Sequence, residues 1–165
     1  MSGTVNPIPE DYGALVVQLV VDDAVAAIAF YEAAFGAKAL YLQHDASGQR
    51  VAHCELLMSL SRFMLHDEFA AAGLLSPKSL GGSPVTLMLY VPNVDAFHEH
   101  AVAHGATVLS EPEDRFWGLR SATLVDPFGH RWLIASRIED LSPDEILRRA
   151  AEAAPGDLRP MGGRN

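Results

Sequence analysis

The sequence predicts an α+β fold made of two copies of one unit, in which each unit runs strand, helix and then three further strands. Two observations carry this prediction. Val21–Leu40 and Val91–Leu109 share one pattern, in which an apolar strand end is followed by a polar cap, a helix-sized run and a Gly-Ala pair. The spacing is also nearly constant, since Gly36 and Gly105 lie 69 residues apart and the starts of the two segments lie 70 apart. Such a spacing indicates a repeated unit. Because neither copy can bury its apolar face alone, we expect the two to face each other across a ligand-binding cleft.

The first unit is predicted to occupy residues 13–68. Ala14–Val21 is almost continuously apolar and rich in valine, which is typical of a buried strand. Asp22-Asp23 then provides an N-cap for an apolar-periodic helix, and Gly36 ends that helix. Three further apolar segments, separated by turn-forming residues, complete the unit. We expect them to be strands at Lys38–His44, Arg50–Met58 and Arg62–His66.

The second unit is predicted at residues 85–138, after a connector. Phe69–Pro84 contains five glycines and prolines, which is too many for a helix or strand. The pattern of the first unit then returns as a strand, a helix that stops at Gly105, and three strands. Asp126-Pro127-Phe128-Gly129, before the last strand, has the composition of a type I turn. The expected elements are Val85–Val91, Val94–His104, Ala106–Leu109, Leu119–Val125 and His130–Ser136.

The two ends of the chain lie outside the paired units. Residues 1–12 are interpreted as a leader, and residues 13–150 as a single domain. Ser142, Pro143 and Glu145 match an N-cap, a first-turn proline and the acidic member of a capping box, so they predict a C-terminal helix at 142–153. Residues 155–165 are rich in Gly, Pro and Arg and are predicted to be disordered.

The bulk composition excludes several classes of protein. The chain has 165 residues, 49% apolar and 20% charged, as is typical of a soluble globular protein. A formal net charge of −9 with dispersed basic residues argues against nucleic-acid binding. The sequence contains neither the roughly 20-residue apolar run that spans a bilayer nor the features of a secretion signal. We therefore predict a cytoplasmic protein without a membrane partner. The single Cys54 permits no intrachain disulfide and is expected to be a small buried residue.

Four motifs, taken in order, resemble a known superfamily. They are Val20-Val21-Asp22-Asp23-Ala24, Phe30-Tyr31-Glu32-Ala33-Ala34-Phe35-Gly36-Ala37, Phe116-Trp117-Gly118 and Asp126-Pro127-Phe128-Gly129-His130-Arg131-Trp132. In this order, and followed by Ile138-Glu139-Asp140-Leu141-Ser142-Pro143, they resemble the vicinal oxygen chelate superfamily, and within it the PhnB-like branch of the glyoxalase and bleomycin-resistance proteins. The resemblance implies paired βαβββ units that form a cupped mixed sheet, and a homodimer. It does not specify a function, because one fold hosts many chemistries.

Metal-dependent members of this superfamily hold a divalent ion through four side chains, and the resemblance places these four positions in the present sequence. They fall near the start of the first strand and in the last strand of each unit, at Val16, Leu65, Thr86 and Leu133. Divalent ions of this kind need carboxylate or imidazole donors, which the set lacks. The sequence therefore predicts no metal at these positions and no cofactor.

Polar residues inside apolar strands are the remaining candidates for a ligand site, because burial of an unpaired polar group is costly. Gln18 shares a strand face with Val16, and the same face of the second unit carries Thr86, Met88 and Tyr90.

His53 and Glu55 alternate around Cys54, so both project from one face of their strand. If that face is concave, an imidazole and a carboxylate meet in the cleft and form a plausible proton-transfer pair. The other interpretation is that both line a solvent-facing strand and interact weakly. Under the first interpretation, we expect both side chains to face the same cavity as Gln18 and Tyr90.

The turn that carries Phe116 and Trp117 is a second candidate region. It forms either a wall over an apolar ligand or a turn packed on the core or on a dimer partner. Arg115 and Arg120 flank the turn and are candidates to clamp an anionic group.

Two histidine-containing segments are expected to be structural. In His66-Asp67-Glu68, neighbouring side chains point to opposite faces, which favours a strand end over a metal cluster. His98, His100 and His104 are expected on the outer face of their helix. The last two have the spacing of a helical metal pair, but no third ligand is evident.

Two functional hypotheses follow. In the first, the chain is a metal-independent small-molecule-binding protein of the bleomycin-resistance type that holds an apolar or aromatic compound. In the second, it is a lyase or isomerase that uses His53 and Glu55 as general acid and base, or a non-standard metal site that includes them. The ligand-binding candidates are Gln18, His53, Glu55, Met88, Tyr90, Phe116, Trp117 and Arg120.

Overall fold

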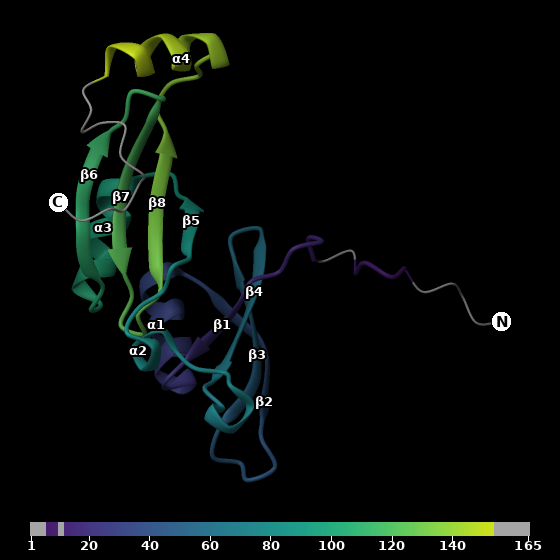
Figure 1. Cartoon of the computed structure of the whole chain (residues 1–165). Helices are drawn as coiled ribbons and strands as arrows, with labels where there is room; N and C mark the ends of the chain where they lie inside the picture. Colours follow the sequence, from purple (N-terminus) through teal and green to yellow (C-terminus); the bar gives the residue numbers. More distant parts are fainter. Residues whose placement is uncertain (1–5, 10–11, 154–165) are drawn as a thin grey trace. The chain divides into compact units, whose positions relative to one another are not determined.

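The computed structural model describes residues 6–9 and 12–153 and divides the chain into two compact units, one ending at Gly81 and the other beginning at Gly82. Each unit contains a four-stranded mixed sheet with a helix packed against it (Figure 1). The strand order is β1-β4-β3-β2 in the first sheet and β5-β8-β7-β6 in the second. The predicted α+β class, with strand, helix and three strands in each unit, is confirmed.

The first unit follows the predicted order of elements. The first and last strands of its sequence are parallel neighbours, and the other neighbouring strands are antiparallel. Its elements are β1 (Gln18–Val21), α1 (Ala24–Phe35), β2 (Lys38–His44), β3 (Val51–Met58), β4 (Ser61–Asp67), the 3₁₀ turn η1 (Ala70–Ala72) and α2 (Pro77–Leu80).

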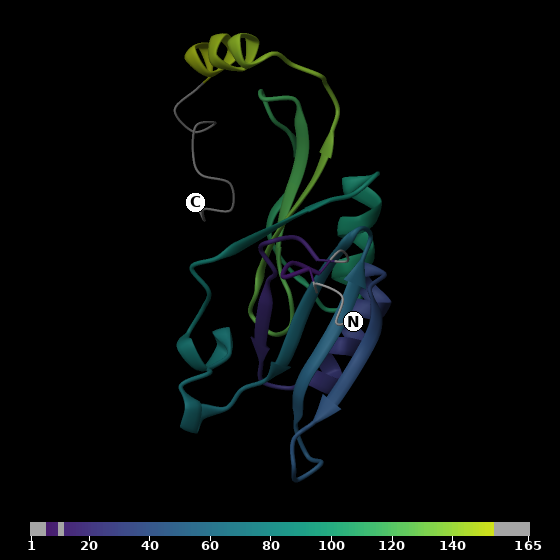
Figure 2. The ribbon, with the colours of Figure 1, turned by 90° about the vertical axis from the view of Figure 1, so that its right-hand side faces the viewer.

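Helix α1 covers one face of this sheet, behind the strands in Figure 2. Asp23 caps its N-terminus by accepting a hydrogen bond from the Ala26 amide, and Gly36 ends it with a φ of 66°. Tyr31 is fully buried, with its ring centroid 5.5 Å from that of Phe63 on β4. Edge-to-face aromatic contacts of this kind stabilise the core beyond their buried area. With α1 on one side, the opposite face of the sheet can carry functional residues.

The second unit repeats this arrangement. Helix α3 contacts the sheet through β6, β7 and β8, and the β7–β8 turn is held by buried Asp126. One carboxylate oxygen of Asp126 accepts hydrogen bonds from the amides of Phe128 and His130, and the other accepts one from the Trp132 indole. The elements are β5 (Thr86–Tyr90), α3 (Val94–Ala103), β6 (Thr107–Asp114), β7 (Leu119–Val125), β8 (Arg131–Arg137) and α4 (Pro143–Glu152).

Three predictions differ from the structure by more than a one-residue shift at the end of an element. Strand β1 begins only at Gln18, because its partner β4 pairs with it from Met64 onward. The connector contains the short helix α2, since Ser76 caps it and Pro77 sits in its first turn, where a missing amide costs nothing. Strand β6 runs on to Asp114, beyond the predicted Leu109, with two register shifts against β7.

The C-terminal helix is confirmed as α4. Figures 1 and 2 show it beyond one end of the second unit's sheet. The predicted disordered tail lies outside the described residues, and so does most of the predicted leader. Among the described residues, no helix is long and apolar enough to cross a membrane.

Candidate functional site

One row of side chains crosses the face of the first sheet that points away from α1. Cross-strand pairing places Gln18 beside Met64, Met64 beside Glu55, and Glu55 beside Tyr41. Side chains paired in this way share one face. The structure therefore puts two sequence candidates, Gln18 and Glu55, on the same surface of β1 and β3.

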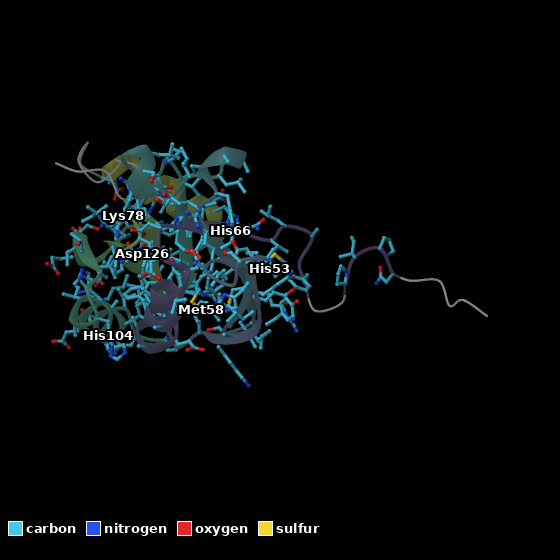
Figure 3. All side chains as sticks on the ribbon, turned by 90° about the horizontal axis from the view of Figure 1, so that it is seen from below. His53, Met58, His66, Lys78, His104 and Asp126 are labelled. Atoms are coloured by element: carbon cyan, nitrogen blue, oxygen red, sulfur yellow. The ribbon has the colours of Figure 1, made fainter. Side chains whose placement is uncertain are left out.

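His53 lies on the same face, two residues before Glu55. Its Nε2 atom is 3.4 Å from Glu55 Oε1, and its ring centroid is 6.0 Å from that of Tyr41. Both His53 and Glu55 are half-buried. Figure 3 labels His53 and Met58, which come from opposite faces of β3, since Met58 is buried on the α1 side. The predicted pairing of imidazole and carboxylate on one strand face is thus observed.

Two residues that were not predicted complete this cluster. The Tyr12 hydroxyl donates a hydrogen bond to Glu55 Oε2. Arg62, on β4, places its guanidinium 5.1 Å from the centroid of the Tyr12 ring and 3.7 Å from Glu55 Oε2. Strand alternation could have predicted the position of Arg62, because it lies two residues before Met64 on β4 and therefore shares its face. Tyr12 lies outside any periodic segment, so the sequence carried no signal for its role.

The electrostatics of the cluster make Glu55 an acceptor. The hydrogen bond from Tyr12, followed by the contacts of His53 and Arg62, holds the pKa of Glu55 below its usual value. The same hydrogen bond raises the pKa of the Tyr12 hydroxyl. Glu55 is therefore a carboxylate at neutral pH, suited to accept a hydrogen bond or a proton from a ligand.

A pocket of about 460 Å³ adjoins this cluster. Its wall is mostly apolar, with the Glu55 carboxylate as its charged group, and such a combination is typical of small-molecule sites. All of its residues belong to the first unit: Pro7, Ile8, Pro9, Tyr12, Gly13, Ala14, Val16, Glu55 and Met64.

Cys54 contributes nothing to this face. It is fully buried on the α1 side of β3, as predicted for a small apolar residue. Burial raises the pKa of its thiol to about 11, so the reactive thiolate is scarce at neutral pH.

Two candidates of the second unit, Met88 and Tyr90, lie on the corresponding face of the second sheet. Met88 pairs with Leu133 and Tyr90 with Ala135, and both Met88 and Tyr90 are exposed. Because these residues belong to a different unit from His53 and Glu55, a shared cavity stays a prediction.

Arg120 lies on the other side of the second sheet from Met88 and Tyr90. Its guanidinium donates to both carboxylate oxygens of Asp95 on α3, at 2.7 and 2.6 Å, and to Asp114 at 2.7 Å. The structure thus does not bring Arg120 together with the other candidates, and its donors are engaged.

Phe116 and Trp117 form the β6–β7 turn, with ring centroids 4.7 Å apart in a T-shaped contact. Both are half-buried. The Phe116 carbonyl accepts a hydrogen bond from Arg149 of α4, while Arg115 contacts Glu113 and Ser121. Within this unit the turn is held by its own neighbours, and its role as a ligand wall stays a prediction.

The structure corrects one of the four metal positions. Leu65 is fully buried on the α1 side of its sheet, so it cannot be the counterpart of Leu133. Met64 is the counterpart, because it pairs with Gln18 as Leu133 pairs with Met88.

The donor set at these positions still does not fit a divalent ion of the kind the superfamily binds. The corrected set of Val16, Met64, Thr86 and Leu133 offers one thioether and one hydroxyl, not carboxylates or imidazoles. In the part of the chain that the structure describes, no group of three His, Cys, Asp or Glu side chains is placed to hold a metal.

The prediction that His98 lies on an outer helix face is wrong. His98 is buried, and its Nε2 atom is 3.6 Å from Glu111 on β6, within ion-pair range but beyond hydrogen-bond distance. Strand β6 runs on past the predicted Leu109, which brings Glu111 to the side of the helix that carries His98. Asp67 acts structurally, as expected for a strand end, accepting hydrogen bonds from the amides of Ala24 and Val51.

Uncharacterized proteins of two mycobacteria are similar to this chain over most of its length. The protein from Mycobacterium bovis is 40% identical over 147 residues, covering 87% of this chain and 95% of that protein. The protein from Mycobacterium tuberculosis is also 40% identical over 147 residues, covering 87% of this chain and 85% of its own length.

Several solved structures share the fold. TioX from a Micromonospora species has a TM-score of 0.60 at 22% identity, with 76% of this chain and 98% of that chain covered. A gene product of Arabidopsis thaliana has a TM-score of 0.60 at 27% identity, covering 75% and 98%. The fosfomycin resistance protein FosX of Listeria monocytogenes, solved with Mn(II) and sulfate, has a TM-score of 0.59 at 18% identity, covering 84% and 97%.

A family model matches residues 13–134, a stretch that contains β1 to β7 and the first half of β8. It agrees with the superfamily that the four sequence motifs resemble, and the solved structures above have the same fold. The chain therefore belongs to the Glyoxalase/Bleomycin resistance protein/Dioxygenase superfamily.

Proposed function

We propose that this protein binds an apolar or aromatic small molecule, without a metal ion, in the pocket on the open face of the first sheet. The observation that carries the proposal is the pocket itself, which combines an apolar wall with the half-buried Glu55 carboxylate. A largely apolar cavity with one oriented polar group is suited to hold a ligand of mixed character. We extend the site to Gln18 and His53, which share this face.

Metal independence is part of the proposal. FosX was solved with Mn(II), whereas the four metal-ligand positions of this chain carry Val16, Met64, Thr86 and Leu133. These side chains do not supply the donors that such an ion requires. No step of binding is therefore assigned to a metal.

The proposal is tested with N-phenylnaphthylamine, a neutral fluorescent probe that reports apolar pockets. We expect saturable binding that a chelator leaves unchanged. Ala14→Trp fills the pocket from an exposed position outside any strand, so it should weaken binding by about tenfold or more, which corresponds to about 1.4 kcal/mol. Ala46→Trp, in the β2–β3 turn, is the matched control and should bind like the parent. Equal binding by both variants would refute the assignment of the pocket.

An enzymatic function is the second candidate, favoured by the 3.4 Å contact between His53 and Glu55. In this version Glu55 removes a proton from the substrate and His53 returns one, as a lyase or isomerase requires. Glu55→Gln and His53→Gln would then abolish turnover while leaving the affinity for the neutral probe nearly unchanged. A parent protein that binds a natural ligand and releases it chemically unaltered would exclude this version.

Three broader assignments belong to the same proposal. We place the chain in the PhnB-like branch on its motifs, expect it in the cytoplasm, and expect it to work as a homodimer that binds neither nucleic acid nor membranes. The net charge of −9 supports the exclusion of nucleic acid. Light scattering of the purified chain tests the homodimer.

A further inference from the structure

Tyr12 is bound by its own sheet in the way that a small aromatic ligand would be bound. Its hydroxyl donates to Glu55 Oε2, and the Arg62 guanidinium lies 5.1 Å from its ring centroid. The residue also lines the apolar pocket beside Met64. A hydrogen-bond acceptor, a cation near the ring and an apolar wall together recognise one chemical group, which is a phenol.

Tyr12 can leave this position without breaking the sheet. It precedes β1, and among the described residues the first ladder pair of β1 is Gln18 with Met64. Besides the contacts of its side chain, Tyr12 donates a backbone hydrogen bond to the Pro9 carbonyl in the same segment. Glu55 and Arg62, by contrast, are fixed on paired strands of the sheet. The groups that recognise the phenol are therefore held in place independently of Tyr12.

Resting on the proposed function above, we propose that Tyr12 is an internal substitute for the ligand, and that the pocket takes a hydroxyaromatic compound whose ring and hydroxyl replace those of Tyr12. Glu55 accepts the hydroxyl hydrogen of the ligand, and Arg62 lies over its ring. The rest of the molecule extends along the apolar wall formed by Val16 and Met64.

The charge of Glu55 selects against other ligand classes. Its pKa is lowered by the contacts of Tyr12, His53 and Arg62, so it remains a carboxylate at neutral pH. A carboxylate repels anionic ligands such as carboxylic acids or phosphates at this point, but it accepts a hydrogen bond from a neutral hydroxyl. Glu55 should therefore discriminate between a phenol and its methyl ether, because the ether has no hydroxyl hydrogen to donate.

The experiment compares para-cresol with para-methylanisole, which has the same ring but no hydroxyl hydrogen, by NMR titration of the full chain. Tyr12→Ala vacates the subsite, so it should bind para-cresol about tenfold more tightly than the parent does, and about tenfold more tightly than it binds the ether. Adding Glu55→Leu, which keeps the volume but removes the acceptor, should abolish this preference. Tyr41→Ala is the matched control, because Tyr41 is the cross-strand neighbour of Glu55 on the same face, and it should show no gain.

Failure of the hydroxyaromatic assignment can be distinguished from failure of the proposed function. If Tyr12→Ala binds cresol and the ether equally while N-phenylnaphthylamine still binds, the hydroxyaromatic assignment is overturned and the pocket stands. If Tyr41→Ala produces the same gain as Tyr12→Ala, the assignment is likewise overturned. If N-phenylnaphthylamine fails to bind to the parent and to Tyr12→Ala, the proposed function fails, and this inference fails with it.

Discussion

Gly118 ties the aromatic β6–β7 turn to the segment that follows β8. Its carbonyl accepts hydrogen bonds from the amides of Ile138 and Glu139, and its φ is 83°. A Cβ atom at this position would lie 3.0 Å from the Glu139 carbonyl oxygen. Both the positive φ and this close approach require glycine.

We predict that Gly118→Ala lowers the free energy of unfolding by about 2–5 kcal/mol, the sum of left-handed backbone strain and steric overlap. Gly48→Ala is the control, since Gly48 has a φ of 72° but no atom within 4 Å of the place that a Cβ would occupy. It should lose about 1–2 kcal/mol from strain alone. Urea denaturation measures both values, and equal losses would contradict the role given to the close approach.

At the scale of residues, strand alternation predicted part of the site correctly. It placed His53 and Glu55 on one face and Cys54 on the other, as observed. It misplaced the last-strand position at Leu65, although the 69-residue offset between Gly36 and Gly105 also relates Met64 to Leu133. The offset between Gln18 and Met88 is 70, and a difference of one residue between the two units moves a side chain to the opposite face.

Helices α1 and α4 are stabilised by different kinds of contact. Six residues of α1 are buried against its sheet, whereas α4 has none buried. Instead, α4 is held by exposed ion pairs, in which Arg149 contacts Glu139 at 2.8 Å and Glu145 at 2.9 Å. Exposed pairs of this kind contribute little to stability.

We therefore predict that α4 opens locally while α1 stays folded. Backbone amides of α4 should exchange with solvent about a hundredfold faster, or more, than those of α1 after correction for intrinsic rates. Hydrogen exchange followed by NMR measures this ratio. Equal protection of the two helices would contradict the view that α4 is held by exposed contacts and not by burial.

Acid should weaken α4 further. Arg148, and then Arg149, lower the pKa of Glu145 from 4.5 to about 2. A carboxylate with a lowered folded-state pKa stabilises the fold above its unfolded pKa and loses that effect as the pH falls through the folded value. Protection of α4 should thus fall between pH 4.5 and about 2, and the double variant Arg148→Gln, Arg149→Gln should lose this pH dependence. An unchanged profile in the double variant would refute the assignment to these ion pairs.

At the scale of elements, apolar periodicity predicted every helix and strand of the repeat, and for β2 and β7 it also predicted the observed bounds. It failed where the partner strand or the local cap decides the outcome. Strand β1 is short because β4 pairs with only part of the apolar run. Helix α2 forms in a stretch rich in breakers because Ser76, Pro77 and Gly81 stand at the positions where caps favour them.

The whole molecule offers an apolar edge for assembly. Strand β2 is an edge of its sheet, and its residues Leu40, Tyr41 and Leu42 are exposed. Unpaired edges with apolar side chains tend to associate with a second strand. We predict a dimer mass by light scattering at micromolar concentration, and Tyr41→Lys with Leu42→Lys should shift it toward the monomer. A monomer mass for the parent chain would contradict the homodimer.

Metal independence can be tested on the stability of the whole molecule. A ligand that binds only the folded state raises its stability, so a chelator should leave the melting temperature unchanged. Elemental analysis of protein purified without a polyhistidine tag should find no stoichiometric zinc, nickel, manganese or iron. One tightly bound equivalent, together with a fall in melting temperature on chelation, would overturn this part of the account.

The central claim is that the open face of the first sheet binds a small molecule without a metal. It is tested most directly by NMR of protein labelled at its methionine methyl groups. Met64 lines the pocket, and buried Met58 on the opposite face of the same sheet is an internal control. With a panel of neutral aromatic compounds in excess chelator, we predict a saturable shift of the Met64 signal and none of Met58. A Met64 signal that no compound moves, or that moves only after a divalent ion is added, would contradict the claim.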